Sequence, residues 1–304
     1  MKIIFAGTPE AAVPTLEALI SSDFEVVAVL TRPDAPQGRK RILTPSPVAQ
    51  VAIAQSIPVI YANRIDDKVQ KAIEDSEADL GVVVAYGALL PQQTLDSVKL
   101  GWINLHFSTL PHWRGAAPVQ WQVISGASQA GSSVFQLVQE LDAGDVYDSR
   151  EWPILPDETA GELLTRLSVL GARQVLDVVR SIDTRFAEPK PQIGESTYAR
   201  KLSLEDGHLN LSQDSAFVYN QFRGVTPEPG AFVLFGDERL KIIEARLGTD
   251  EEVVPSAITS VSKKLYLGCV TGSLELISVQ PAGKQGMSAM DWFRGLRQEV
   301  VHVS

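Results

Sequence analysis

The sequence predicts an α/β protein in which a Rossmann-like, mostly parallel sheet is followed by a smaller C-terminal β-barrel of OB-like type. Three observations support this fold class. Short apolar runs alternate with segments of helical periodicity through the first half, as in a parallel sheet with right-handed crossovers. Two prolines and a glycine then punctuate residues 187–194. Beyond them, short apolar runs follow one another closely, with turn residues between them.

The strands of the first half are expected wherever apolar residues run together. They are predicted at residues 2–6, 25–30, 58–60, 80–85, 102–107 and 132–138. Helices are predicted between them at residues 14–20, 48–55 and 68–74. Leucine and valine recur at helical spacing over residues 159–182, so a long amphipathic helix is expected to close this domain.

The second half changes character after the proline-rich segment. We predict a first domain at residues 1–189, a linker at 190–204 and a second domain at 205–304. Short strands are predicted at residues 231–235, 239–245, 257–262, 264–270 and 273–279. Turn signals such as Gly236-Asp237 and Thr271-Gly272 separate them, which favours a small barrel or sandwich.

Composition excludes several classes of protein. With 44% hydrophobic and 21% charged residues, the 304-residue chain has an ordinary globular composition. Its single cysteine, Cys269, excludes an internal disulfide and a cysteine-based zinc site. The net charge of −10 argues against broad affinity for nucleic acid, so a polyanionic partner would have to meet local basic patches. We find no apolar run of membrane-spanning length and no signal-peptide core, and we expect a cytoplasmic protein.

The stretch from residue 104 to residue 118, N-L-H-F-S-T-L-P-H-W-R-G-A-A-P, carries the densest chemistry. Asn104 and His106 are two residues apart on a predicted strand, so both side chains point the same way. They could be a satisfied polar pair at a strand end, or they could polarise a carbonyl and move a proton. Asp142 follows the next predicted strand, and ligands of parallel sheets bind beyond strand carboxyl ends, which favours the second interpretation. Gly144 is expected to permit a turn that aims Asp142 inward.

At these residues the chain resembles the folate-dependent formyltransferases. The segment N-L-H-F-S-T-L-P-H-W-R-G-A-A-P-V-Q is similar to their active-site segment, and L-D-A-G-D is similar to their aspartate loop. Five further segments resemble the branch of that family which formylates methionyl-tRNA: residues 3–19, 82–91, 196–201, 229–231 and 280–295. The resemblance covers essentially the full length.

The resemblance implies a reaction and a set of site residues. The reaction is transfer of the formyl group of 10-formyltetrahydrofolate to the α-amino group of methionine on initiator methionyl-tRNA, for translation initiation. Asn104, His106 and Asp142 would be catalytic. The folate would contact a turn formed by Ser108, Thr109, Leu110 and Pro111. No metal is implied, and we expect a monomer without a membrane partner.

A basic loop follows the second strand. Arg39, Lys40 and Arg41 could be merely solvated cations, but the resemblance implies that this loop contacts the acceptor end of tRNA. Three cations can neutralise about three phosphates, which would make binding sensitive to salt. Lys40 and Ile42 depart from the family pattern, and Arg39 is the best candidate for direct contact.

The second half contributes further cations and two further departures. The cations could track a nucleic-acid backbone along an OB-type barrel, although each could equally be an isolated surface charge; they are Lys190, Arg200, Lys201, Arg223, Lys263, Lys264, Lys284 and Arg294. Glu228 and Leu211 replace tryptophans that are usual in the family, and we expect both positions to be packing sites.

Two alternative functions stay open. A formyltransferase acting on a small amine, such as an amino-sugar nucleotide or glycinamide ribonucleotide, would share the same three catalytic residues. A non-catalytic module that binds RNA or folate is the third possibility, although binding alone would not need a proton relay. The basic loop and the Q-P-A-G-K segment favour the tRNA-directed enzyme.

Overall fold

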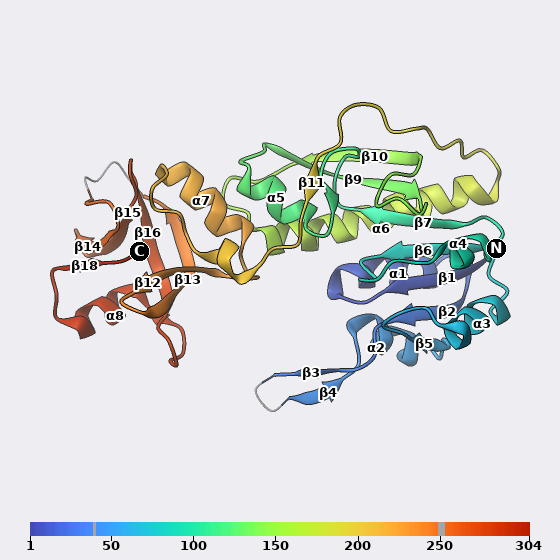
Figure 1. The fold of residues 1–304 in the computed structure, drawn as a ribbon, viewed down its shortest axis with the longest axis horizontal. Coiled ribbons are helices and arrows are strands. Elements are labelled where there is room, and N and C mark those ends of the chain that lie inside the picture. Colours follow the sequence, from blue (N-terminus) through green and yellow to red (C-terminus); the bar gives the residue numbers. More distant parts are fainter. Residues whose placement is uncertain (39–40, 249–252) are drawn as a thin grey trace. The chain divides into compact units, whose positions relative to one another are not determined.

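The computed structural model describes residues 1–38, 41–248 and 253–304 (Figure 1). The chain forms two compact units. The N-terminal unit comprises Met1–Gly115, Gly131–Trp152 and Leu164–Tyr198, and the C-terminal unit comprises Ala116–Ala130, Pro153–Leu163 and Ala199–Ser304. The units interleave along the chain, whereas the boundaries predicted at 189 and 204 follow chain order. The domain assignment drawn from the sequence stays a prediction.

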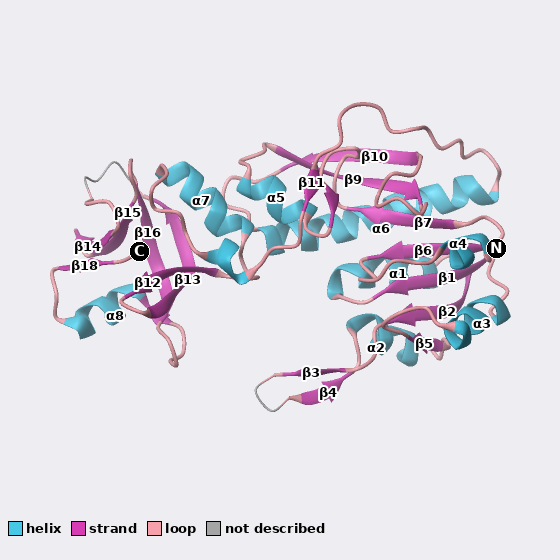
Figure 2. Ribbon diagram, in the orientation of Figure 1, coloured by secondary structure: helices cyan, strands magenta, loops and turns pink. Residues whose placement is uncertain are grey.

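A seven-stranded sheet organises the N-terminal unit, with the strand order β10-β9-β7-β6-β1-β2-β5 (Figure 2). Its strands are β1 (Lys2–Gly7), β2 (Glu25–Thr31), β5 (Val59–Tyr61), β6 (Leu80–Val84), β7 (Trp102–His106), β9 (Gln129–Gln136) and β10 (Val146–Pro153). The pairs from β7 to β5 are all parallel, and β9 runs antiparallel to β7. The predicted Rossmann-like, mostly parallel sheet is therefore confirmed.

Helices connect the parallel strands, and local sequence explains where they begin. They are α1 (Val13–Ile20), α2 (Pro47–Ala54), α3 (Asp67–Asp75) and α4 (Gln92–Asp96), with a 3₁₀ turn at Glu10–Ala12. The long helix α6 (Ala160–Asp183) follows β10, the last strand of the sheet along the chain. The Ser46 hydroxyl accepts a hydrogen bond from the Ala49 amide and caps α2, whose first residue is Pro47. Asp66 caps α3 in the same way through the Val69 amide.

On one face of this sheet, alternate residues of the central strands form a buried cluster. Ile4 and Ala6 of β1 belong to a buried cluster with Ile73 of α3 and Leu95 of α4. Trp102 of β7 is fully buried in the same cluster. A β-carbon added to Gly81 on the neighbouring strand would lie only 2.1 Å from the Trp102 ring. The large ring at the start of β7 thus depends on a glycine beside it.

The C-terminal unit contains an antiparallel sheet that closes on itself. Its strands follow the order β12 (Ala231–Phe235), β13 (Glu238–Leu247), β16 (Ser273–Gln280), β15 (Lys264–Gly268), β14 (Ala257–Val261) and β18 (Val300–His302). Leu234 of β12 and Ser304 beyond β18 exchange two backbone hydrogen bonds of 2.6 and 3.0 Å, which joins the two edges. The predicted C-terminal barrel is therefore confirmed.

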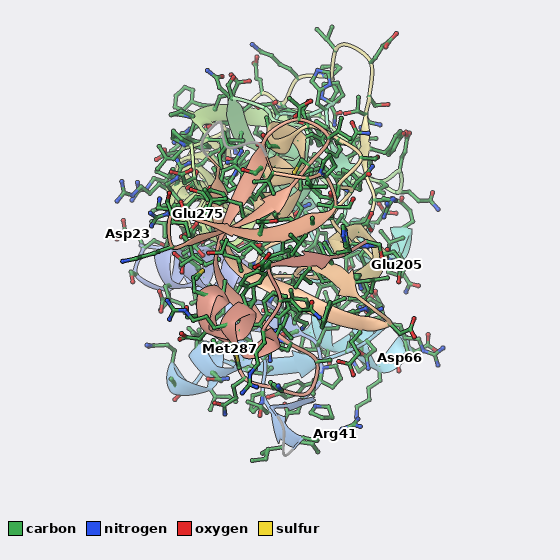
Figure 3. All side chains as sticks on the ribbon, turned by 90° about the vertical axis from the view of Figure 1, so that its left-hand side faces the viewer. Asp23, Arg41, Asp66, Glu205, Glu275 and Met287 are labelled. Atoms are coloured by element: carbon green, nitrogen blue, oxygen red, sulfur yellow. The ribbon has the colours of Figure 1, made fainter. Side chains whose placement is uncertain are left out.

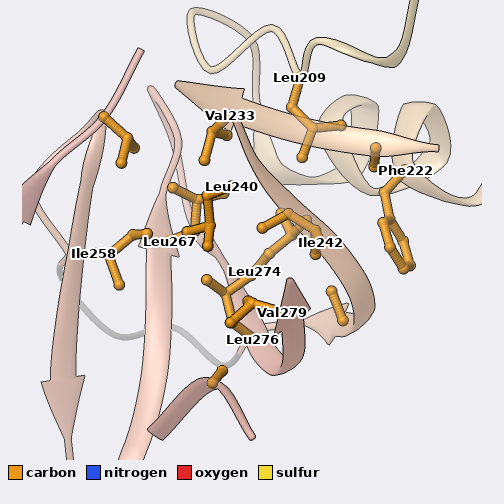
Figure 4. Close-up of a cluster of buried hydrophobic side chains, with 14 of the residues drawn as sticks. Leu209, Phe222, Val233, Leu240, Ile242, Ile258, Leu267, Leu274, Leu276 and Val279 are labelled. Atoms are coloured by element: carbon orange, nitrogen blue, oxygen red, sulfur yellow. The ribbon is translucent and has the colours of Figure 1, made fainter. Parts of the chain in front are cut away.

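Side chains of the strands and of two helices form the core of this barrel. Its helices are α7 (Ser215–Gly224) and α8 (Ala289–Leu296), and α5 (Pro118–Ile124) packs against α7. Figure 4 shows the strand side chains pointing into one cluster, among them Leu240, Leu267 and Leu274, all buried. Short elements complete the list: β8 (Arg114–Gly115), β11 (Tyr198–Ala199), β17 (Met287–Ser288) and a 3₁₀ turn at Leu204–Gly207. None of the described helices has the length and apolar character that a membrane crossing needs.

Candidate functional site

His106 ends strand β7 and is held by a backbone carbonyl. Its Nε2 lies 2.9 Å from the carbonyl oxygen of Trp113. Because a carbonyl oxygen only accepts, Nε2 must carry the hydrogen. The ring also meets Phe135 edge-on, with ring centroids 6.4 Å apart. The position and tautomer of this imidazole are thus fixed by its surroundings.

Asp142 faces the other nitrogen of this ring. Its Oδ2 lies 3.7 Å from His106 Nδ1 and accepts a hydrogen bond of 2.7 Å from the amide of Gly115. Both side chains are buried, with each residue 6% exposed. The structure therefore brings together two residues 36 positions apart in the chain, at a distance suited to an ion pair if His106 is protonated.

Burial governs the protonation of His106. Burial lowers the pKa of His106 below its usual value, while the Asp142 carboxylate and the Trp113 carbonyl oppose that shift. A neutral His106 with its hydrogen on Nε2 leaves the Nδ1 lone pair free to accept a proton. The cation formed in this way would have the Asp142 carboxylate beside it. The pair can therefore take up a proton and stabilise the charge that results.

Asn104 lies two residues earlier on β7 and pairs in register with Phe135. Its Oδ1 is buried and has no hydrogen-bond partner among the described residues. Leaving such an atom unpaired typically costs about 1–3 kcal/mol. Native structures accept this cost mainly where a function or a bound molecule explains it. The unpaired amide oxygen is therefore an independent sign of a ligand site at the end of β7.

The turn after β7 is tied to the sheet by serines. The Ser108 hydroxyl donates to the His112 carbonyl at 2.6 Å, and the Ser133 hydroxyl donates to the Ser108 carbonyl at 2.8 Å. The Leu110 amide donates to Ser133 Oγ at 3.1 Å. Ser108 and Pro111 are buried, while Thr109 and Leu110 are half-buried. Within this predicted folate-contacting turn, Thr109 and Leu110 therefore offer the accessible side chains.

The Asp142 turn differs from the expected one. Gly144 does not have a positive φ, and Asp142 itself adopts the left-handed conformation with φ 49°. Gly144 is needed for a different reason, since a β-carbon there would lie 1.8 Å from the Gln136 carbonyl oxygen. The expectation that Gly144 supplies conformational freedom was thus wrong, because the glycine supplies space.

Comparison with known proteins assigns the family. The family model described as formyl transferase matches residues 1–179, and the one described as formyl transferase, C-terminal domain, matches residues 201–297. The chain belongs to the formyl transferase family. It is 49% identical to the methionyl-tRNA formyltransferase of Leifsonia xyli subsp. xyli over 301 residues, which cover 99% of both chains. It is 46% identical to the methionyl-tRNA formyltransferase of Paenarthrobacter aurescens, which covers 97% of each.

Solved structures share the fold of this formyl transferase. An N-formyltransferase from Helicobacter canadensis, crystallised with folinic acid and dTDP-3-aminofucose, matches 92% of this chain and 99% of its own with a TM-score of 0.70 and 19% identity. The methionyl-tRNA formyltransferase from Clostridium thermocellum matches 84% of this chain and 96% of its own with a TM-score of 0.61 and 17% identity. At these identities the likeness concerns the fold alone.

The basic loop of the formyl transferase is partly a hairpin. Strands β3 (Ala35–Gln37) and β4 (Ile42–Thr44) pair antiparallel, where the sequence predicted only a loop. Arg39 and Lys40 lie outside the described residues. Arg41 is exposed near the hairpin tip with φ 50°, and its side chain stands away from the hairpin (Figure 3). Ile42, which departs from the family pattern, is 62% exposed.

The cations of the second half are not equally available. Arg223 is buried, and its guanidinium donates to the Glu158 carbonyl at 3.1 Å and stacks on the Tyr219 ring. It was wrong to count Arg223 as a surface charge, because it joins α7 to the segment before α6. Lys264 is paired with Glu275 at 3.0 Å. These residues are therefore poorer candidates for contacting phosphates than unpaired surface lysines.

The two tryptophan replacements have different surroundings. Leu211 is buried in the core of the C-terminal unit, which confirms the expected packing site. Glu228 is exposed, so the expectation of a packing site there was wrong. Its carboxylate stays in water, which explains how a charged residue is tolerated at this position.

A cavity of about 410 Å³ lies in the N-terminal unit, between the region of α4 and the segment that follows β9. Its lining is partly apolar and partly polar, and consists of Leu95, Val98, Leu137 and Val138 together with Gln92, Asp96, Lys99, Gly101 and Gln136. Val138 belongs to the segment that leads to Asp142, so the cavity and the aspartate share one loop.

No group of three His, Cys, Asp or Glu side chains in the described part of the chain is placed to hold a metal ion.

Sequence reasoning missed several groups at the site because they belong to the backbone. The carbonyl of Trp113 and the amide of Gly115 hold His106 and Asp142, and neither depends on the identity of a side chain. Gln192 was also missed, because it lies in the segment predicted as a linker. Nothing in its neighbourhood of the sequence signals the contacts it makes.

Proposed function

We propose that this chain transfers the formyl group of 10-formyltetrahydrofolate to the α-amino group of methionine on initiator methionyl-tRNA. The observation that carries the proposal is its similarity, over nearly the whole chain, to methionyl-tRNA formyltransferases at 44–49% identity. The pairing of His106 with Asp142 gives such a reaction its proton acceptor. The formyl-carrying folate is a substrate that is consumed in each turnover, and it supplies the one-carbon group.

Asn104 and His106 of β7 and Asp142 of the loop between β9 and β10 would divide the chemistry between them. His106 Nδ1 accepts the proton of the attacking amine as the new C–N bond forms, and Asp142 stabilises the imidazolium. The same proton then passes to the departing folate nitrogen, so His106 returns to its neutral form. The Asn104 amide donates to the formyl oxygen as negative charge develops there. Removing one such donor typically slows turnover by about 10²–10³-fold.

The cavity suits the flat ring of the folate. Its lining combines apolar side chains, such as Leu95 and Leu137, with polar ones, such as Gln136, which suits a ring that has apolar faces and a polar edge. The turn that contains Thr109 and Leu110 would then contact the rest of the folate. A large residue at the rim tests this placement. Val138→Trp is expected to raise the KM for the folate about tenfold or more while the KM for methionyl-tRNA stays near wild type, and equal effects on both would contradict it.

The remaining parts of the proposal concern the tRNA. The basic loop of Arg39, Lys40 and Arg41 would contact the acceptor end, and residues 205–304 would bind the tRNA body, with residues 1–189 catalytic and 190–204 a linker. Action as a monomer in the cytoplasm belongs to this proposal as well. Steep loss of tRNA affinity with added salt is expected, since phosphate contacts release counterions.

A sugar-amine acceptor is the alternative that one observation favours. Among the solved structures, the N-formyltransferase crystallised with dTDP-3-aminofucose and a sugar 3N-formyl transferase match with TM-scores of 0.70 and 0.68, above the 0.61 of the methionyl-tRNA formyltransferase from Clostridium thermocellum. The sequence outweighs this, because those structures are less than 20% identical. A formyl-transfer assay with a radiolabelled donor decides between them. Methionyl-tRNA should be formylated, and activity only toward dTDP-amino sugars would overturn the proposal.

A further inference from the structure

Residues 190–198, called the strap here, are anchored on both halves of the site. At one end, Lys190 and Val146 exchange backbone hydrogen bonds of 2.9 and 2.8 Å, four residues beyond Asp142. At the other end, Thr197 Oγ1 accepts from the amide of Trp113 at 2.8 Å, and the Thr197 carbonyl accepts from the amide of Arg114 at 2.8 Å. The strap therefore holds the segment whose carbonyl binds His106 and the segment that carries Asp142.

One side chain of the strap reaches between these anchors. The Gln192 Oε1 accepts from the Nε and Nη2 of Arg114 at 3.2 and 2.7 Å. Its Nε2 donates to the carbonyls of Asp142 and Gly144 at 2.8 and 2.9 Å. The neighbouring Ile193 is 90% exposed. Gln192 is thus anchored by four hydrogen bonds within an otherwise solvent-facing stretch.

Chemistry leaves this amide one orientation. A guanidinium only donates hydrogen bonds, so the oxygen of Gln192 must face Arg114. Carbonyls only accept, so the nitrogen must face Asp142 and Gly144. Arg114 is 9% exposed, and besides Gln192 its guanidinium contacts the carboxylate of Glu140 at 3.5 Å. Both halves of the amide therefore have partners that no other orientation could satisfy.

These bonds act on a strained turn. Asp142 is left-handed, a conformation that typically costs a non-glycine residue about 1–2 kcal/mol and needs support from its surroundings. Its side chain is held by Gly115, and its own carbonyl is held by Gln192. We propose that Gln192 is a positioning residue of the reaction, which through Arg114 and the Asp142 turn keeps the Asp142 carboxylate against His106. This inference rests on the proposed function of that pair.

Gln192→Glu tests the role with little change of shape. The glutamate keeps an oxygen for Arg114 and adds a charge pair with it, which favours folding. Its second oxygen faces two carbonyls and repels them, so the Asp142 turn should move. We expect kcat to fall about 10²-fold, the penalty typical of a small misplacement. The KM for methionyl-tRNA should stay near wild type, and the acidic limb of the pH–rate profile should move to lower pH, because Asp142 no longer supports the imidazolium.

Two comparisons separate positioning from a general structural role. Ile193→Ala, in the same strap, should keep wild-type kcat and pH profile. In a double-mutant cycle, Gln192→Glu should add little to the loss already caused by Asp142→Asn, because both changes act on one carboxylate. If Gln192→Glu does not fold, Gln192→Met has the same length without polar atoms and should give the same kinetic loss.

The outcomes also separate this inference from the proposed function. If the wild-type enzyme formylates methionyl-tRNA and Asp142→Asn is slow, but Gln192→Glu and Gln192→Met keep the wild-type kcat and pH profile, the positioning role is refuted. Full additivity of the two changes would refute it as well. If the wild-type enzyme formylates no methionyl-tRNA, the proposed function fails first.

Discussion

Replacing Asp142 by asparagine removes one charge from the site and little else. Asparagine has the same shape, and its Oδ1 can still accept the amide hydrogen of Gly115, which Asp142 Oδ2 accepts at 2.7 Å. The turn should therefore stay folded. What is lost is the attraction between the carboxylate and the protonated ring of His106, whose Nδ1 lies 3.7 Å away.

The distance sets the size of the effect. Two unit charges 3.7 Å apart attract by about 4 kcal/mol at an effective dielectric constant of about 20. Since each 1.36 kcal/mol of barrier is about a factor of ten, the loss of kcat should reach at most about 10³-fold, and we expect about 10²–10³-fold. If the His106 ring carries only part of a positive charge in the transition state, the loss of kcat should lie near the lower end of this range.

The pH profile gives a second, independent signature. Burial lowers the pKa of His106 and Asp142 opposes that shift, so the variant should have a still lower pKa. The neutral ring is the active form in this mechanism, so activity is lost as pH falls through this pKa. The acidic limb of kcat/KM should therefore move to lower pH in Asp142→Asn while the maximum rate falls.

The assay is formyl transfer to methionyl-tRNA, measured from roughly pH 5 to 8, with circular dichroism as the check on folding. The unfolded-state pKa of histidine, about 6.5, marks the reference for the shift. A variant with kcat within a few-fold of wild type would refute the reasoning. So would an acidic limb that moves to higher pH, because it would mean that Asp142 does not stabilise the cation.

Three further changes test other parts of the site and fold. Asn104→Ala should lower kcat about 10²–10³-fold without lowering the free energy of unfolding, because it removes a buried oxygen that has no hydrogen-bond partner among the described residues. Kinetics and denaturant unfolding of the same variant check this, and a clear fall in the free energy of unfolding would contradict it. Arg39→Ala should reduce the slope of log affinity for tRNA against log salt by about one while the KM for folate is unchanged; losses toward both ligands would count against it. Gly81→Ala should destabilise the fold by about 1–3 kcal/mol, because its β-carbon would lie 2.1 Å from the Trp102 ring; an unchanged thermal midpoint would show that the ring can move aside.

The strands of the parallel sheet could be predicted because burial on both faces leaves a continuous apolar signal. Residues Ile3, Ile4, Phe5 and Ala6 are all fully buried. Strand β10 lacked that signal, because it lies at the edge of the sheet, where three of its eight residues are exposed and none is buried. Helix α7 was also missed: apolar and polar residues alternate irregularly over its ten residues, glycine and proline residues follow it, and its apolar face packs into the core of the barrel.

The side chains of the candidate site were visible from the sequence, whereas their supports were not. Asn104, His106 and Asp142 have residue types that suit proton transfer, and strand alternation places the first two on one side of β7. The buried partners of Arg223 depend on a contact between α7 and a segment 65 residues earlier, which no local pattern encodes. The same holds for Gln192, whose partners lie 48 to 78 residues away.

The carbonyl that fixes the His106 ring has an evolutionary consequence. Every residue at position 113 would present the same oxygen, so no point mutation there can delete the anchor outright. The residues accepted at this position are limited instead by the backbone conformation, because Trp113 has φ 62°, which glycine and asparagine adopt most easily. A library of substitutions at position 113 should therefore lose activity according to the difficulty of that conformation, and hardly at all according to polarity or size.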